Sequence, residues 1–323
     1  MHVLIVGAGS IGQLYGYFIQ RGGASVDVYV KARYVEDAER GFPLYERRKG
    51  LQSPDVFSPD GICTSPDEVA TQTYDTVILC ISSAGLRGSW FEDFADAIGD
   101  TPLVSLIPGI DNRDYFLKYV DEAQLAQGLI TAVSYPAPLP GEEASEPGTA
   151  YWLPPLTPAF FQGPKDLLQP LLQALNGGGM RARMMRKLAE RSAMGTAVLI
   201  PAVAVLETVD WSLAELRRSR EHRKLVDEAA DEALSVVENH FNTRRPFPLR
   251  MLGPISWRGI FTAAPVPPPF DLETYLQVHF TKTGDQTRMY IDECIERRQH
   301  LDAPSPVLQR LREELGDTPE YPS

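Results

Sequence analysis

The sequence is poor in the residues that build metal sites and disulfide frameworks. It contains 3 cysteines and 5 histidines in 323 residues. Cys63, Cys80 and Cys294 lie far apart, form no C-x-x-C pair and have no histidine at metal-ligand spacing. This pattern indicates neither a zinc site nor a disulfide framework, so we expect reduced thiols and no bound metal.

Positive charge and long apolar runs are also scarce. Lys and Arg number 31 against 43 Asp and Glu, which gives a formal net charge of -12. Such a chain repels a phosphate backbone, so nucleic acid is not an expected partner. No apolar run of about 18 residues that could span a bilayer is evident. The first residues enter a strand-and-glycine pattern instead of a signal peptide, so we expect a cytoplasmic protein that does not contact a membrane.

The chain is long enough to bury two cores, since 323 residues exceed one ordinary domain. In the first half, short apolar runs alternate with amphipathic stretches at residues 2–6, 25–30, 76–81, 103–107 and 126–133. Runs of β-branched residues separated by helical patterns are typical of a parallel sheet buried on both faces. Further strand-like segments at residues 148–153 and 180–185 are expected to complete that sheet.

The second half is predicted to be helical from about Lys187. The helical runs cover residues 188–209, 213–240, 271–281, 287–300 and 306–315, with a proline-rich loop at residues 246–269. Pro201 inside the first run predicts a kink, because proline lacks an N–H and crowds the preceding turn.

The strand at residues 2–6 leads directly into a glycine-rich turn and an amphipathic helix. The turn is a G-x-G-x-x-G hexapeptide, Gly7-Ala8-Gly9-Ser10-Ile11-Gly12. In a dinucleotide-binding turn the first glycine makes the tight bend and the second lets a pyrophosphate approach the backbone. The third glycine allows close helix–strand packing, and the helix N-terminus receives the anion. We therefore assign these six residues to cofactor binding.

The predicted fold class is α/β, with an N-terminal Rossmann domain followed by an all-α C-terminal domain. The Rossmann domain is expected to cover residues 1–186, and the helical domain, residues 187–323, to bind substrate or form a dimer.

The residues after the second predicted strand bear on the choice between NAD(H) and NADP(H). In NAD-binding domains, an acid about 20 residues after the glycine motif binds the ribose 2′-hydroxyl. Here the strand ends in Lys31 and Arg33, while Asp27 comes earlier and is expected to point elsewhere. Two cations at this place suit a 2′-phosphate, although solvated loop residues would show the same pattern. We expect NADP(H), bound by Lys31 and Arg33.

A block near the C-terminus adds a second signature. It reads Gly284-Asp285-Gln286-Thr287-Arg288-Met289-Tyr290-Ile291-Asp292 and is followed by Pro304-Ser305-Pro306-Val307. With the initial GAGSIG, Lys31 and the helical second half, this block resembles the ketopantoate reductase family and its GRxTEIDYI and PTP segments. The resemblance covers nearly the whole chain and implies a cleft in which NADPH meets a small 2-oxo acid. It also implies that Ser82, Pro108 and Ala132 lie near the cofactor.

The catalytic positions of the family differ in this chain. The family's Gln-Asn-Gly reads Ile107-Pro108-Gly109, the glutamate of TEIDYI is Arg288, a Ser-Ser segment is Tyr275-Leu276, and the lysine of a V-K motif is Ser82. An electrophile with an oxyanion and a carboxylate needs donors at such positions. We therefore do not expect ketopantoate itself to be the substrate.

The family's general-acid lysine has two conflicting matches. By letters alone it corresponds to Lys187, which Leu188 follows. Counting two helical turns past the preceding predicted strand reaches Met194 or Gly195 instead. The spacing favours Lys187 as a helix-start residue, so Lys187 is a catalytic candidate through the letter match only.

Other polar residues of the second half could serve a reduction, which needs a proton donor beside the acceptor. His279, with Tyr275 one turn earlier on the same predicted helix face, could supply an acid and a hydrogen-bonding partner for the substrate. An ordinary core or exposed histidine would fit the same pattern. Arg288 could hold a substrate carboxylate or form a salt bridge between helices. Glu207, near the end of an apolar helix, must find a partner or face solvent.

We predict an NADPH-dependent reductase of the ketopantoate reductase superfamily that acts on a small, anionic 2-oxo acid, carbonyl or imine. The alternative is an NADP(H)-binding protein without redox catalysis that serves as a sensor or partner-binding module, which the altered positions would explain directly. The sequence leaves the substrate and the oligomeric state open, a homodimer included.

Overall fold

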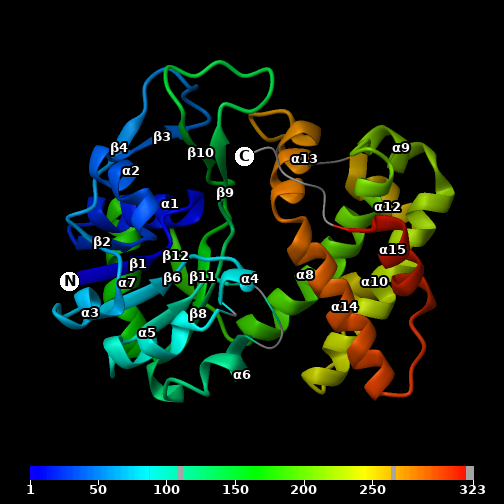
Figure 1. Ribbon diagram of the computed structural model, residues 1–323. Helices are drawn as coiled ribbons and strands as arrows, with labels where there is room; N and C mark the ends of the chain where they lie inside the picture. The colour runs from blue at the N-terminus through cyan, green and yellow to red at the C-terminus, as the bar shows by residue number, and fades with distance from the viewer. Residues whose placement is uncertain (87, 108, 110–111, 263–266, 318–323) are drawn as a thin grey trace. The chain divides into compact units, whose positions relative to one another are not determined.

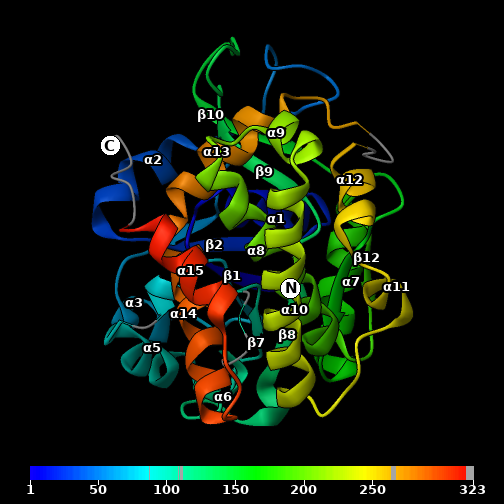
Figure 2. The same cartoon turned by 90° about the vertical axis from the view of Figure 1, so that its right-hand side faces the viewer.

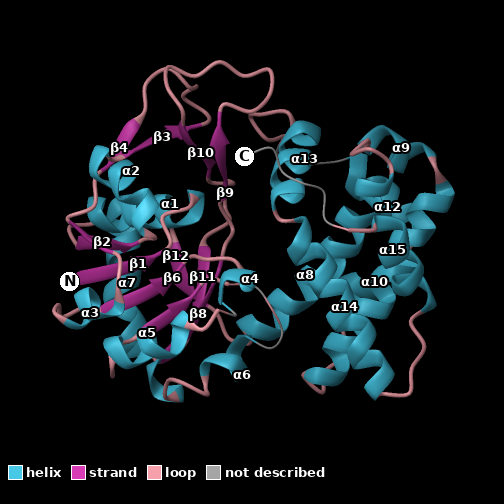
Figure 3. Cartoon of the chain, viewed as in Figure 1, coloured by secondary structure: helices cyan, strands magenta, loops and turns pink. Residues whose placement is uncertain are grey.

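The computed structural model divides into two compact units, Met1–Ala189 and Glu190–Ser323. It describes residues 1–86, 88–107, 109, 112–262 and 267–317. The first unit contains both strands and helices, whereas the described part of the second contains helices alone (Figures 1 and 3). The predicted fold class, a Rossmann-type α/β region followed by a helical region, is therefore confirmed. The division between the units falls within the first turn of helix α8 (Leu188–Thr208).

Eight strands of the first unit form one sheet. They are β1 (His2–Val6), β2 (Ser25–Tyr29), β5 (Gly61–Cys63), β6 (Thr76–Leu79), β7 (Leu103–Ser105), β8 (Leu125–Leu129), β11 (Ala159–Gln162) and β12 (Ala182–Met184). Their order is β12-β11-β8-β7-β6-β1-β2-β5. The six strands from β8 to β5 are parallel. This is the order of a doubly wound dinucleotide-binding sheet, in which the chain leaves β1 toward β2 on one side and later returns to β6 on the other.

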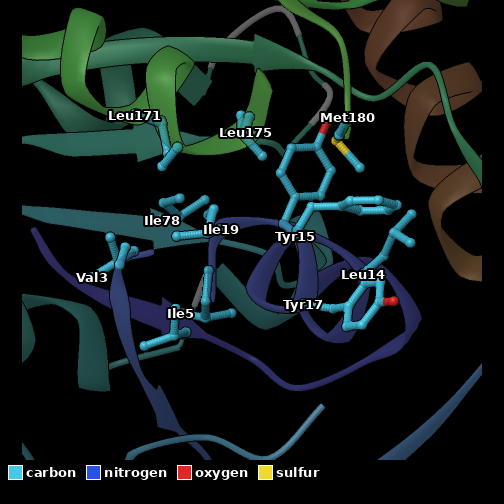
Figure 4. Packing of buried hydrophobic residues seen from close by; sticks show 14 of the residues in the cluster. Val3, Ile5, Leu14, Tyr15, Tyr17, Ile19, Ile78, Leu171, Leu175 and Met180 are labelled. Carbon is cyan, nitrogen blue, oxygen red and sulfur yellow. The ribbon is translucent and has the colours of Figure 1, made fainter. Parts of the chain in front are cut away.

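Apolar side chains on both faces of this sheet build two cores. Val3 and Ile5 belong to the core that also contains residues of α1 and α7, whereas Leu4 and Val6 belong to the core with α3, α5 and α6. Figure 4 shows Leu171 of α7 and Val3 of β1 within the same buried cluster. Burial on both faces explains why the strands read as continuous apolar runs. The helices of this unit are α1 (Ser10–Arg21), α2 (Val35–Arg40), α3 (Pro66–Ala70), α4 (Ser83–Leu86), α5 (Trp90–Ile98), α6 (Asn112–Phe116) and α7 (Lys165–Gly178), with short turns η1 (Ala32–Tyr34) and η2 (Glu122–Gln124).

A second sheet lies outside the predicted architecture. It contains β3 (Phe42–Glu46), β4 (Asp55–Phe57), β9 (Val133–Ala137) and β10 (Gly148–Trp152), in the order β4-β3-β10-β9. The prediction that residues 148–153 complete the main sheet is wrong, because β10 pairs with β3 and β9. The predicted strand at residues 126–133 is divided between β8 and β9, which belong to different sheets. Pairings such as Leu44 with Thr149 join distant segments, and no local pattern records them.

The described part of the second unit is built from eight helices. They are α8, α9 (Leu213–Arg218), α10 (Arg220–His240), α11 (Phe247–Arg250), α12 (Pro254–Thr262), α13 (Leu272–Lys282), α14 (Gly284–His300) and α15 (Pro306–Leu315). Helices α10, α14 and α15 pack against one another (Figure 2). The predicted helix at residues 213–240 is broken at Ser219, whose side chain accepts a hydrogen bond from His222 N and caps α10. The segment at residues 246–269, predicted as a loop, contains α11 and α12.

Helix α8 is 21 residues long and rich in apolar residues. Within the described residues it is the one helix long and apolar enough to cross a membrane by these two criteria. The expectation that no such run exists is therefore wrong for this helix. Half of its most apolar window is buried, and the core helix of a soluble protein passes the same test. The helix continues through Pro201.

Candidate functional site

The glycine loop leaves β1, which lies between β6 and β2 in the main sheet, and ends in α1. Gly7 has φ +92°, a left-handed conformation that glycine adopts without strain. Its N–H donates to Tyr29 O at 3.0 Å, which ties the turn to the end of β2. A Cβ at Gly7 would lie 2.7 Å from the Ile81 side chain. The turn therefore requires glycine for both its conformation and its packing.

Gly9 and Gly12 meet opposite surroundings. A Cβ on Gly12 would lie 2.0 Å from Gly7 O, so only glycine lets α1 approach the turn this closely. A Cβ on Gly9 would meet no atom within 4 Å, so the backbone at Gly9 is open to a ligand. Helix α1 begins at Ser10 with no acidic residue in its first turn. Its free N–H groups and helix dipole thus favour an anion beside Gly9.

The end of β2 carries cations and no accessible acid. The carboxylate of Asp27 is buried and lies 3.1 Å from His2 Nε2. It also accepts a hydrogen bond from the Tyr74 hydroxyl at 3.0 Å. Asp27 thus points into a buried polar network, as predicted. Lys31 and Arg33 are exposed on the turn that follows, where the Arg33 guanidinium lies over the Tyr34 ring at 4.7 Å.

The remaining cofactor candidates follow neighbouring strands of the same sheet. Ser82 comes shortly after β6, and its hydroxyl accepts a hydrogen bond from Gly85 N at 3.0 Å. Ala132 comes shortly after β8 and is half-buried. Because β1, β6, β7 and β8 are parallel, their carboxyl ends meet at the edge of the sheet where the glycine loop begins. Pro108 lies outside the described residues.

His279 and Tyr275 share one face of α13, as predicted. Their rings stack with centroids 5.4 Å apart. Burial, together with the nearby Lys282 ammonium, lowers the pKa of His279 to about 4. Burial raises the pKa of Tyr275 to about 12. At pH 7 both side chains are therefore uncharged. His279 is then a neutral imidazole and not the imidazolium that would act as a general acid.

Arg288 has the salt bridge that the sequence left as one of two alternatives. Its Nη2 lies 2.8 Å from a carboxylate oxygen of Glu207, on α8. Its remaining donors bind the carbonyl oxygens of Gly284, Leu315 and Gly316. The guanidinium is buried, and each of its three nitrogens donates a hydrogen bond within the second unit. The structure thus favours a link between helices over a substrate anchor, and it gives Glu207 the partner that its position demands.

Comparison with known proteins places these features in a family. Residues 3–138 match the family model described as ketopantoate reductase PanE/ApbA. The N-terminal region of this chain is thus similar in sequence to the ketopantoate reductase family. The resemblance predicted from the sequence is thereby confirmed. No curated protein matches the chain in sequence.

Solved structures of two ketopantoate (2-dehydropantoate) reductases and of a D-mandelate dehydrogenase share the fold over nearly the whole chain. A PanE/ApbA family ketopantoate reductase from Ralstonia eutropha JMP134 is 17% identical with a TM-score of 0.74, covering 98% of this chain and 97% of that one. A 2-dehydropantoate 2-reductase from Geobacter metallireducens GS-15 is 15% identical with a TM-score of 0.72, covering 98% and 99%. The ternary structure of D-mandelate dehydrogenase with NADH and anilino(oxo)acetate is 15% identical with a TM-score of 0.72, covering 98% and 97%.

Lys187, which matches the general-acid lysine of the ketopantoate reductase family by letters alone, lies on a turn. Lys187 is exposed, has φ +56° and immediately precedes α8, as the spacing argument predicts for a helix-start residue. Met194 and Gly195, which the spacing places at the family's lysine position, lie inside α8.

Gln13 is a contact of the glycine loop that the sequence analysis missed. Its side-chain Nε2 donates to Ala8 O at 2.8 Å, and its Oε1 accepts from the Thr149 hydroxyl at 2.6 Å. A glutamine directly after the third glycine of the motif was the available signal. Its partner Thr149 lies 136 residues away, in the second sheet, and no sequence pattern pointed to it.

Among the described residues, no group of three or more His, Cys, Asp or Glu is placed to hold a metal ion.

Proposed function

We propose that this chain binds NADP(H) at the glycine loop and reduces a small 2-oxo acid, carbonyl or imine. The observation that carries the proposal is the contrast between Gly9, which has open space beside it, and Gly12, whose Cβ would lie 2.0 Å from Gly7 O. A turn built in this way at the strand-order switch point fits a dinucleotide diphosphate. When bound, the nicotinamide supplies the hydride, and the protein positions cofactor and acceptor.

The proposed preference for NADP(H) is supported by charge at the end of β2. Lys31 and Arg33 are exposed there, and Asp27 is engaged with His2 and Tyr74. No carboxylate of β2 is thus available to a ribose 2′-hydroxyl, while two cations could meet a 2′-phosphate. D-mandelate dehydrogenase was solved with NADH, so both cofactors need to be titrated.

We expect Lys31→Ala to raise the dissociation constant for NADPH about tenfold, because an ion pair with the 2′-phosphate is lost. The constant for NADH should stay within about twofold, since that cofactor lacks the 2′-phosphate. Nicotinamide fluorescence titration measures both. Lys49→Ala is the matched control, because Lys49 is an exposed lysine paired with Glu46. Equal NADH and NADPH affinity in the wild type, or an unchanged preference in Lys31→Ala, would contradict the proposal.

The acceptor is proposed to differ from ketopantoate. A guanidinium, Arg288, replaces the glutamate of the family motif, and it is engaged by Glu207. Tyr275 stands where the family has a serine pair, and the donors expected around a 2-oxo acid are therefore rearranged. His279 and Lys187 are the two side chains whose replacement we would test for a loss of proton transfer.

Single-turnover oxidation of NADPH with a panel of 2-oxo acids, aldehydes and imines tests the proposed activity. We expect hydride transfer to at least one acceptor and negligible transfer to ketopantoate. Turnover of ketopantoate within about tenfold of an ordinary reductase would contradict the proposed substrate class.

A second candidate function is cofactor binding without redox catalysis. It is favoured by the engagement of Arg288 within the second unit, by the pKa of His279 at about 4, and by the position of Lys187 on an exposed turn. NADPH binding without hydride transfer to any member of the panel would support this sensor or partner-binding role.

A further inference from the structure

Gln13 connects the glycine loop with the second sheet. Its backbone N–H donates to Gly9 O at 2.9 Å, in addition to the side-chain bonds to Ala8 O and the Thr149 hydroxyl. A carbonyl oxygen can only accept a hydrogen bond, so the amide nitrogen of Gln13 must face Ala8 and its oxygen must face Thr149. The orientation of this side chain is therefore determined by its partners.

These bonds set the direction of the N–H groups in the loop. In a trans peptide, the C=O of one residue and the N–H of the next point in opposite directions. Gln13 holds the carbonyls of Ala8 and Gly9 toward α1. The N–H groups of Gly9 and Ser10 consequently point away from α1. A Cβ on Gly9 would meet no atom within 4 Å, so there is room for a ligand beside these donors.

We propose that Gln13 is a positioning residue for the dinucleotide diphosphate. It holds the loop with the N–H groups of Gly9 and Ser10 outward, and its bond to Thr149 makes β10 of the second sheet a support of the cofactor site. Thr149 is buried, so its hydroxyl depends on Gln13 for a partner. This inference rests on the proposed function, because it assumes that a dinucleotide binds at the loop.

Four variants separate the two side-chain hydrogen bonds of Gln13. Gln13→Ala removes both, whereas Gln13→Glu can still accept from Thr149 but cannot donate to Ala8 O. Thr149→Val removes the supporting hydroxyl at nearly constant volume, and Thr149→Ser restores it. Gln20→Ala is the matched control, because Gln20 lies on the same helix and its Nε2 donates to Ser58 O at 2.8 Å, away from the loop.

The readouts are dissociation constants for NADPH and for adenosine 2′-monophosphate, with the melting temperature of each variant. We expect Gln13→Ala and Gln13→Glu to raise the constant for NADPH about tenfold or more, and Thr149→Val about threefold to tenfold. Thr149→Ser and Gln20→Ala should stay within about twofold of the wild type. Adenosine 2′-monophosphate has no diphosphate, so its constant should stay within about twofold in every variant.

The outcomes distinguish this inference from the proposed function. If the wild type binds NADPH and both Gln13 variants bind it equally well, the positioning role is overturned while the proposed function stands. Equal weakening of NADPH and adenosine 2′-monophosphate also overturns it, because the defect would then be general. A wild type that binds neither NADPH nor NADH overturns both. If the Gln13 variants do not fold, the comparison of Thr149→Val with Thr149→Ser decides.

Discussion

Gly9→Val is expected to abolish NADPH binding while leaving the protein folded. Gly9 has φ -72° and ψ 179°, an extended conformation that valine adopts readily. The added side chain meets no atom of the protein within 4 Å of its Cβ, so it costs little stability. It instead fills the space through which a diphosphate would reach the loop. We expect the dissociation constant for NADPH to rise at least about 100-fold, and the melting temperature to stay within about 3 °C of the wild type.

Gly12→Ala is the informative contrast to this substitution. Its Cβ would lie 2.0 Å from Gly7 O, so α1 or the turn must move. In Gly12→Ala the affinity for NADPH and the melting temperature should fall together, because overpacking of this kind typically costs about 1–3 kcal/mol of folding stability. An unchanged NADPH constant in Gly9→Val, measured on protein with a wild-type melting curve, would show that this loop does not hold the diphosphate.

Glu207→Ala should destabilise the second unit strongly. The change leaves the guanidinium of Arg288 buried without its carboxylate, although three carbonyl oxygens still accept from it. Removing one partner of a buried ion pair typically costs about 3–5 kcal/mol. We expect a loss of about 3 kcal/mol in the free energy of unfolding, which corresponds to a fall of about 10 °C in melting temperature. Chemical denaturation followed by circular dichroism measures it.

Two further variants test the cause of this loss. The double variant Glu207→Leu/Arg288→Leu should recover part of the stability, because it leaves no buried charge behind. Removal of the exposed pair Lys224 and Glu228 on α10 is the control, and it should cost less than about 1 kcal/mol. A loss below about 1 kcal/mol for Glu207→Ala, together with weaker binding of an anionic substrate in Arg288→Ala, would return Arg288 to the role of substrate anchor.

The sequence by itself determined those features that depend on neighbouring residues. The glycine loop was predictable because its requirements are local: a left-handed backbone at Gly7, open backbone at Gly9 and a close helix–strand approach at Gly12. The parallel sheet was predictable because burial on both faces leaves continuous apolar runs. Helix α15 was predicted with its observed bounds, since Pro306 marks its first turn and Gly316 its end.

The tertiary structure decided the features that depend on distant partners. The second sheet exists because β3 pairs with β10, about 100 residues later in the chain, and strand propensity does not say which sheet a segment joins. Arg288 was compatible with two roles until Glu207, 81 residues away, was found beside it. The link from Gln13 to the second sheet depends on Thr149, 136 residues away. In each case the outcome was set by which distant segments folding brings into contact. For Arg288 and Thr149, that contact also determines whether a buried polar group is satisfied.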